Sequence, residues 1–321
     1  MTLSLRSRHA ALALACAGAA GYGVTVVIGR RLAQAGLTPA TALGIRFAVA
    51  AAVLAALLAV RRADRVELAC ALRLLALGAV GYAGQSTLFY LSLQRGTAAT
   101  SILLFYAYPA LVCAIGWLVL RERRPCPRTC AALALSVAGT ALVAVSSGPV
   151  TISALGVVFA LGSALVFALY VLAGQRLSAG VDAMATAALV AAGAALGSAG
   201  QGALTGGLSS PGGRWALLLA YGLFTAAAFT LLFAALARLG ARHTSVVMTL
   251  EAVFAVALAM LLLGEPLGAW QALGGACVLA ATVLVARIRP APARAVLRPA
   301  RSRSPRAAPS APACPAASRS R

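Results

Sequence analysis

The chain has 321 residues, of which 62% are hydrophobic and only 10% are charged. Ordinary soluble domains contain about 45–50% apolar and about 25% charged residues, so this composition excludes a water-soluble globule and indicates a polytopic membrane protein. The formal net charge is +21 and all 27 basic residues are arginines, so the chain lacks the lysine of a P-loop nucleotide site.

Apolar runs long enough to span a bilayer follow one another along the chain. A transmembrane helix needs about 20 mostly apolar residues, and charges mark where it leaves the hydrocarbon. We therefore expect ten spans: 10–29, 37–60, 74–94, 96–120, two within 129–175, 183–204, 215–237, 244–264 and 266–286. The turn sequence Ser146-Ser147-Gly148-Pro149 divides the uncharged stretch 129–175 into two. The predicted fold class is an all-α integral membrane protein.

The arginines are distributed unequally between the two sides of such a protein. Ten spans put both termini on one side, and thirteen arginines ahead of the C-terminal tail fall on that side, against four on the other. The positive-inside rule therefore predicts that the N and C termini are cytoplasmic. We expect a multi-pass protein of the plasma membrane, specifically a bacterial cytoplasmic membrane.

The C-terminal segment 289–321 differs from the rest because Arg, Pro, Ser and Ala dominate it. Such a segment cannot bury enough apolar surface to fold, so we predict a disordered cytoplasmic tail. Two interpretations of the tail remain: it is solvated without a specific role, or it contacts anionic lipid. Nucleic acid is not an expected partner, because the tail has no aromatic residue on which bases can stack.

The chain repeats itself at an offset of 143 or 144 residues. Three pairs of segments align in this way: Phe89–Arg95 with Phe233–Leu239, Tyr108-Pro109 with Glu251-Ala252, and Arg121-Glu122 with Gly264-Glu265. Five predicted spans lie in each half, and an odd number makes the second copy start on the opposite side of the membrane. We therefore predict a cytoplasmic segment 1–9, two inverted five-helix repeats over 10–147 and 148–288, and the tail 289–321.

These motifs resemble the drug/metabolite transporter superfamily, EamA type. The resemblance rests on Leu250–Phe254 through Leu261–Glu265, on Tyr108–Ala110 through Leu120–Glu122, and on Arg46-Phe47, and it covers about residues 10–288. It implies two five-helix bundles around a central cavity and carriage of small metabolites or drugs, often as export. Ala252 stands where many relatives have proline, so the residue that would kink the ninth span there is absent.

Two charged residues inside predicted spans are the leading site candidates. Glu251 is the only carboxylate within a span, where a charge costs about 2.5–3.5 kcal/mol on insertion scales and therefore faces a cavity or a partner. Glu251 has two functional interpretations, as a group that binds and releases a proton or as a contact for a substrate amine. The alternative is a structural carboxylate that holds helices together. Arg46 is the counter-ion of Glu251, binds a substrate carboxylate, or extends its side chain to the membrane interface.

Further candidates for lining a cavity are polar or aromatic residues within the spans, which can contact an apolar or aromatic substrate. These are Tyr22, Gln85, Tyr90, Tyr108, Trp117 and Thr249. The alternative for each is core contact or an interhelical hydrogen bond. We expect no metal site, because the seven cysteines do not cluster with histidine.

Together these features predict a secondary transporter that works by alternating access on a small-molecule substrate, without a cofactor. We expect an exporter, driven either by coupling to protons or by the substrate gradient alone. The alternatives are a membrane scaffold, a channel or an integral-membrane enzyme. An enzyme is disfavoured because Asp64 and Asp182, the only aspartates, both lie in predicted loops, whereas metal or base chemistry needs paired carboxylates or a His-Asp set.

Overall fold

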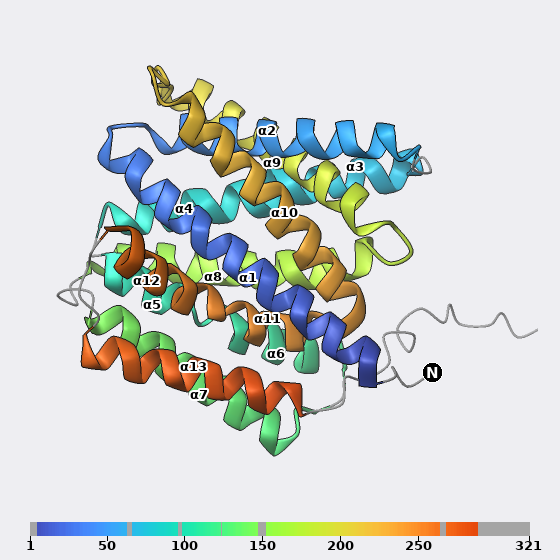
Figure 1. Ribbon diagram of the computed structural model, residues 1–321, viewed down its shortest axis with the longest axis vertical. Helices are drawn as coiled ribbons and strands as arrows, with labels where there is room; N and C mark the ends of the chain where they lie inside the picture. Colours follow the sequence, from blue (N-terminus) through green and yellow to red (C-terminus); the bar gives the residue numbers. More distant parts are fainter. Residues whose placement is uncertain are drawn as a thin grey trace, which may run out of the picture.

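The computed structural model describes residues 5–62, 66–95, 98–122, 124–146, 152–263 and 268–287, and these residues form helices without strands (Figure 1). Seven helical stretches are long and apolar enough to cross a membrane, and Tyr108–Leu118 and Ala272–Ala286 are shorter apolar helices. The predicted all-α membrane fold is therefore confirmed. The tail 289–321 lies outside the described residues, and so do residues 1–4 of the N-terminal segment.

The first repeat comprises α1 (Leu5–Gln34), α2 (Pro39–Val60), α3 (Leu68–Ala76), the π-helical turn η1 (Leu77–Tyr82), α4 (Ala83–Leu93), α5 (Ala98–Phe105), α6 (Tyr108–Leu118) and α7 (Pro127–Ser146). The second comprises α8 (Ala154–Leu177), α9 (Ala183–Thr205), α10 (Trp215–Leu239), α11 (Ala241–Met248), α12 (Leu250–Leu263) and α13 (Ala269–Ala286). Pro39 begins α2, where its missing N–H costs nothing and its fixed φ suits the helix.

Several helices are longer than the uncharged runs that predicted them. The first helix begins at Leu5 and continues through Arg31, and the third span begins at Leu68 and includes Arg73. Charged residues mark the edge of the hydrocarbon, and a helix continues past that edge because arginine is a good helix former. Of the turn predicted at 146–149, Ser146 ends α7 and the remaining three residues lie outside the described chain.

The two repeats pack around each other with a consistent pairing of equivalent helices. α2 lies along α9 at one edge of the molecule, and α7 lies along α13 at the opposite edge (Figure 1). Between these edges α1 packs on α10, and α8 packs correspondingly on α4 and η1. Because each contact has a counterpart in the other repeat, residues of both repeats meet in the middle of the molecule.

The fourth and ninth spans are each interrupted at equivalent positions. The first break lies at Tyr106 and Ala107, between α5 and α6, and the second lies at Thr249, between α11 and α12. The ninth span thus breaks without a proline at Ala252. The Thr249 hydroxyl donates to the Val246 carbonyl at 2.6 Å, and this bond competes with the regular backbone ladder.

Large apolar side chains remain exposed along the outward faces of the helices. On α8, Leu161, Leu165 and Leu169 form one such stripe, each residue four after the last, with 41–48% of their surface accessible. In water a contiguous apolar surface of this kind would promote aggregation, whereas lipid tails cover it without cost. These faces therefore fit a protein that is surrounded by a bilayer.

Candidate functional site

Glu251 lies in the first turn of α12, directly after the break at Thr249. The break gives the ninth span a second helix N-terminus within its length, and such a terminus favours a carboxylate there. The side chain is partly exposed, and it makes no hydrogen bond or close ion pair with any residue in the described ranges. Its carboxylate interacts electrostatically with the Arg46 guanidinium.

Arg46 lies on α2 with only 6% of its surface exposed, so it does not extend to the membrane interface. Its guanidinium donates to Thr225 at 2.6 Å, to the Tyr221 hydroxyl at 3.0 Å and to Thr25 at 3.5 Å. It also lies over the Tyr221 ring, 4.5 Å from the centroid. Its donors are therefore engaged by α1 and α10, and Glu251 is a charged neighbour rather than its hydrogen-bonded partner.

An aromatic cluster fills the middle of the molecule next to these charges. Its members come from α1, α2, η1, α8 and α10, and they are Tyr22, Phe47, Tyr82, Phe167, Tyr170 and Phe229. Tyr82 is the hub, with ring centroids 5.1 Å from Phe229, 5.2 Å from Phe47 and 5.4 Å from Tyr170. Edge-to-face contacts at such distances fix the rings in place.

Glu251 lies within electrostatic range of phenol groups in this cluster and at the neighbouring break in the fourth span. Its charge interacts with Tyr22 and Tyr82 of the aromatic cluster, with Tyr106 in the break, and with Tyr108 at the start of α6. The Tyr170 hydroxyl is buried without a hydrogen-bond partner among the described residues. A buried hydroxyl of this kind can bind a polar group that enters the site.

Helices α1 and α12 approach each other closely at Gly23. A Cβ atom at Gly23 would lie 2.7 Å from the Cβ of Phe254 and 3.0 Å from the Ala255 nitrogen. Only glycine allows the two helices to come this close. Tyr22 precedes this contact on α1, and its phenol lies within electrostatic range of Glu251.

Three of the predicted site residues form hydrogen bonds between the repeats. The Gln85 side-chain amide donates to the Ser163 hydroxyl at 3.1 Å, which joins α4 to α8. Thr249 accepts from the Ser136 hydroxyl of α7 at 3.0 Å. The Tyr108 hydroxyl donates to a backbone carbonyl of α11 at 3.2 Å. These contacts connect the repeats around the Glu251 site.

The two remaining candidates are Tyr90 and Trp117. Tyr90 belongs to α4, and its side chain lies outside the described part of the chain. Trp117 is half-buried near the far end of α6, with the Arg124 guanidinium 5.4 Å from its ring centroid. At 1.5 Å per residue, it lies about 13 Å along α6 from Tyr108.

Sequence reasoning missed Tyr82 and Tyr221, which lie at the centre of the aromatic cluster and against Arg46. One pattern in the sequence marks both: each tyrosine is adjacent to a glycine within a span, as is Tyr22. Glycine permits close helix contact, so a tyrosine beside it is directed into the interior. Thr225 is marked only as a polar residue within a span, and Phe229 carries no comparable signal.

A second charged contact joins the repeats at one end of the molecule. Arg242, in the first turn of α11, contacts Glu122 beyond the C-terminus of α6 with 3.2 Å between Nη2 and Oε2. The two side chains are 17% and 28% exposed. Gly116 leaves room for the pair, because a Cβ there would lie 3.0 Å from the Glu122 carboxylate. The ion pair therefore closes the junction between α6 and α11.

Comparisons with known proteins agree with this architecture. The sequence matches the profile of the EamA-like transporter family in two segments, residues 9–145 and 154–287. A solved structure described only as "Crystal structure of protein" is similar to this chain with a TM-score of 0.73 at 18% identity, over 87% of this chain and 96% of that one. At this identity the likeness indicates a shared fold. No curated protein matches the sequence.

Proposed function

Because the chain belongs to the EamA-like transporter family, within the drug/metabolite transporter superfamily, we propose that it is a secondary carrier that exports small metabolites or drugs. Two inverted repeats that meet around one site support alternating access, since such halves can rock against each other about that site. We take residues 10–147 and 148–288 as the two moving units. The substrate and the surrounding lipid are the partners of this cycle.

The observation that carries the proposal is that the Glu251 carboxylate makes no hydrogen bond to any residue in the described part of the chain. Ionisable groups within membrane helices commonly form proton and substrate pathways, because burying them has a cost that only function offsets. Arg46 has its donors engaged by Tyr221, Thr225 and Thr25, so the acceptor at this site is the carboxylate. We propose that Glu251 binds a proton and a cationic group of the substrate in turn, which couples export to proton entry.

The Glu122–Arg242 ion pair supports the alternating-access cycle at one end of the molecule. The pair joins the chain just beyond α6 of the first repeat to α11 of the second, so it opposes separation of these two helices. At the position equivalent to Arg242 the first repeat has Ala98 or Ala99. The closing charge pair is therefore specific to one end, which we propose is the cytoplasmic end.

The proposed orientation follows from the arginine distribution, which favours cytoplasmic termini in a bacterial cytoplasmic membrane. In that orientation the loop between α6 and α7, with Arg121 and Arg124, faces the cytoplasm together with Arg128 in the first turn of α7. Protons that enter down their gradient would then release substrate outward. Export against a concentration gradient is the expected result.

Counterflow in proteoliposomes tests the carrier directly. Vesicles loaded with pooled amino acids, nucleosides or cationic drugs would be diluted into a trace of the labelled compound, and we expect saturable, competable uptake that depends on the internal pool. A channel would give uptake that internal substrate does not accelerate, and an enzyme would return a compound of altered mass. Failure of folded protein with every pool in a broad panel would contradict the carrier and favour a scaffold.

A further inference from the structure

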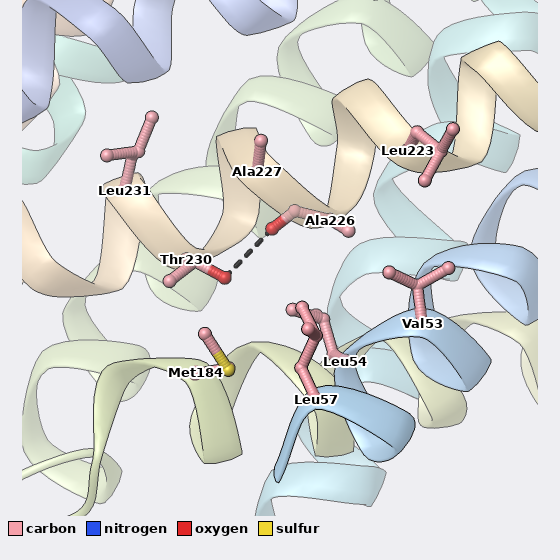
Figure 2. Close-up of a pocket in the computed structure, with 9 residues that line it drawn as sticks. All are labelled: Val53, Leu54, Leu57, Met184, Leu223, Ala226, Ala227, Thr230 and Leu231. Carbon is pink, nitrogen blue, oxygen red and sulfur yellow. Dashed lines mark hydrogen bonds between the residues drawn. The ribbon is translucent and has the colours of Figure 1, made fainter. Parts of the chain in front are cut away.

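A lateral groove opens between α2 and α10, away from the Glu251 site (Figure 2). The two helices touch where Gly222 meets Val49, because a Cβ at Gly222 would lie 2.4 Å from the valine side chain. Beyond this point they diverge, and α9 forms the floor of a groove of about 340 Å³. Its walls include Val53 and Leu57 of α2, Met184 of α9, and Ala227, Thr230 and Leu231 of α10.

The side chains that line the groove are suited to an apolar occupant. Its one hydroxyl, that of Thr230, donates to the Ala226 carbonyl of the same helix at 2.9 Å, as Figure 2 shows. The remaining lining side chains are hydrocarbon or thioether. Leu57 and Leu223 at the rim are 44% and 51% exposed, so the groove opens to the hydrocarbon around the helices. An apolar chain would restore the dispersion contacts that an empty groove lacks.

Both helices that wall the groove lead to an exposed arginine at its wide end. Arg61 follows Leu57 by four residues and Arg238 follows Leu231 by seven, so each lies on the groove-lining face of its helix. Asp182 also lies at this end, but its carboxylate caps α9 by accepting from the backbone of Met184 at 2.9 Å and of Ala185 at 3.1 Å. Each of the two walls therefore leads from an apolar lining to an exposed arginine at this end.

We propose that this groove binds one anionic phospholipid, with an acyl chain between α2 and α10 and its phosphate group at Arg61 and Arg238. The dimensions fit, because the twelve residues from Val49 to Arg61 span about 18 Å, against about 15 Å for half of the hydrocarbon core. Basic residues at the ends of such interhelical grooves attract anionic head groups. The lipid would contact both repeats, since α2 belongs to the first and α9 and α10 to the second.

Native mass spectrometry of the full chain in detergent tests the site with phosphatidylglycerol and phosphatidylcholine as probes. We expect one phosphatidylglycerol to be retained in preference to phosphatidylcholine. Replacing each arginine (Arg61→Gln, Arg238→Gln) is expected to weaken retention of phosphatidylglycerol about fivefold per residue, at about 1 kcal/mol each. Arg128→Gln, at an exposed arginine of α7 away from the groove, is the matched control and should leave retention unchanged.

A steric variant separates groove binding from head-group attraction. Ala227→Leu fills the groove and is expected to displace both lipids, whereas Ala131→Leu on an exposed face of α7 should displace neither. Equal retention of the two lipids by the wild type, or equal losses in the Arg128→Gln control, would overturn the proposal. A monomer–dimer shift in Ala227→Leu without any change in bound lipid would assign the groove to a second copy of the chain.

A crosslinking measurement on the wild-type chain avoids any dependence on variant folding. Phosphatidylglycerol with a photoreactive group in its acyl chain would be incorporated into proteoliposomes and the adducts mapped by peptide sequencing. We expect adducts concentrated on the segments around Leu57, Met184 and Leu231. Adducts spread evenly over the outward faces of α8 and α13 would contradict a specific site.

Discussion

Neutralising either partner of the Glu122–Arg242 ion pair is expected to increase opening at that end of the protein, which Cys113 reports. Cys113 lies on α6 with 4% of its surface exposed, and it interacts electrostatically with both partners of the ion pair. Because Cys113 is buried beside the ion pair, we expect separation of α6 and α11 to expose it to a thiol reagent. In a chain whose other cysteines are serines, the rate of Cys113 modification therefore measures the population of the open state.

The magnitude follows from the exposure of the pair. Partly exposed ion pairs contribute about 0.2–1 kcal/mol, because solvent screens the charges and ordering the two side chains has an entropic cost. At the upper end of this range, loss of the pair raises the ratio of open to closed molecules about fivefold. We expect Glu122→Gln and Arg242→Gln each to accelerate Cys113 modification by up to about this factor.

The double variant decides whether the two residues act as a pair. If they do, Cys113 in the double variant Glu122→Gln/Arg242→Gln should be modified at about the same rate as in either single variant, because the contact is lost only once. A rate equal to the product of the single effects, or rates indistinguishable from the parent chain in all three variants, would refute the reasoning. Gly116→Ala supplies a third arm, since its Cβ displaces the Glu122 carboxylate without removing a charge.

Three further predictions test the surroundings of the site and the predicted topology. Gly23→Ala should destabilise the protein by about 1–3 kcal/mol, because the new methyl group forces α1 away from α12. The thermal midpoint measured by intrinsic fluorescence should fall accordingly. Gly44→Ala is the control and should not lower this midpoint, because a Cβ at Gly44 would have nothing within 4 Å. Arg46→Lys should also lower that midpoint, since a lysine cannot keep all three hydrogen bonds and each bond to a charged group contributes about 1.5–3 kcal/mol. Hydrogen bonds from Thr129 lower the pKa of the Cys126 thiol. Cys126 should therefore be alkylated faster than Cys130 at neutral pH, and its alkylation should persist to lower pH. Single-cysteine proteins titrated with an impermeant maleimide would check this, and modification from the outside of intact cells would contradict cytoplasmic placement.

Much of the architecture could be predicted from the sequence because the bilayer imposes a simple rule of length and charge. The helix Ala183–Thr205 and the helix Trp215–Leu239 begin where the uncharged runs begin. The offset of 143 residues also placed Tyr108 opposite Glu251, and each proves to lie in the first turn of a helix that follows a break. The break at Thr249 itself could not be predicted, because it depends on a hydroxyl bonded to the preceding turn rather than on proline.

The site was predictable in its charges and much less so in its contacts. Glu251 and Arg46 stand out as rare charges in apolar runs, which composition alone reveals. The partners of Arg46 are Tyr221 and Thr225, which lie 175 and 179 residues away along the chain. Which residues meet across helices depends on the rotation and crossing of those helices, and in a span that is apolar on all sides the sequence pattern does not specify rotation.

Proton-driven flux through Glu251→Gln tests the central claim most directly. Proteoliposomes with a substrate identified by counterflow would be given an inward proton gradient, with the wild type, Glu251→Gln and the matched substitution Glu67→Gln in a loop compared side by side. We expect Glu251→Gln to keep part of the substrate exchange and lose all uphill flux, while Glu67→Gln behaves as the wild type. Full uphill flux that still depends on the proton gradient in Glu251→Gln would contradict the account.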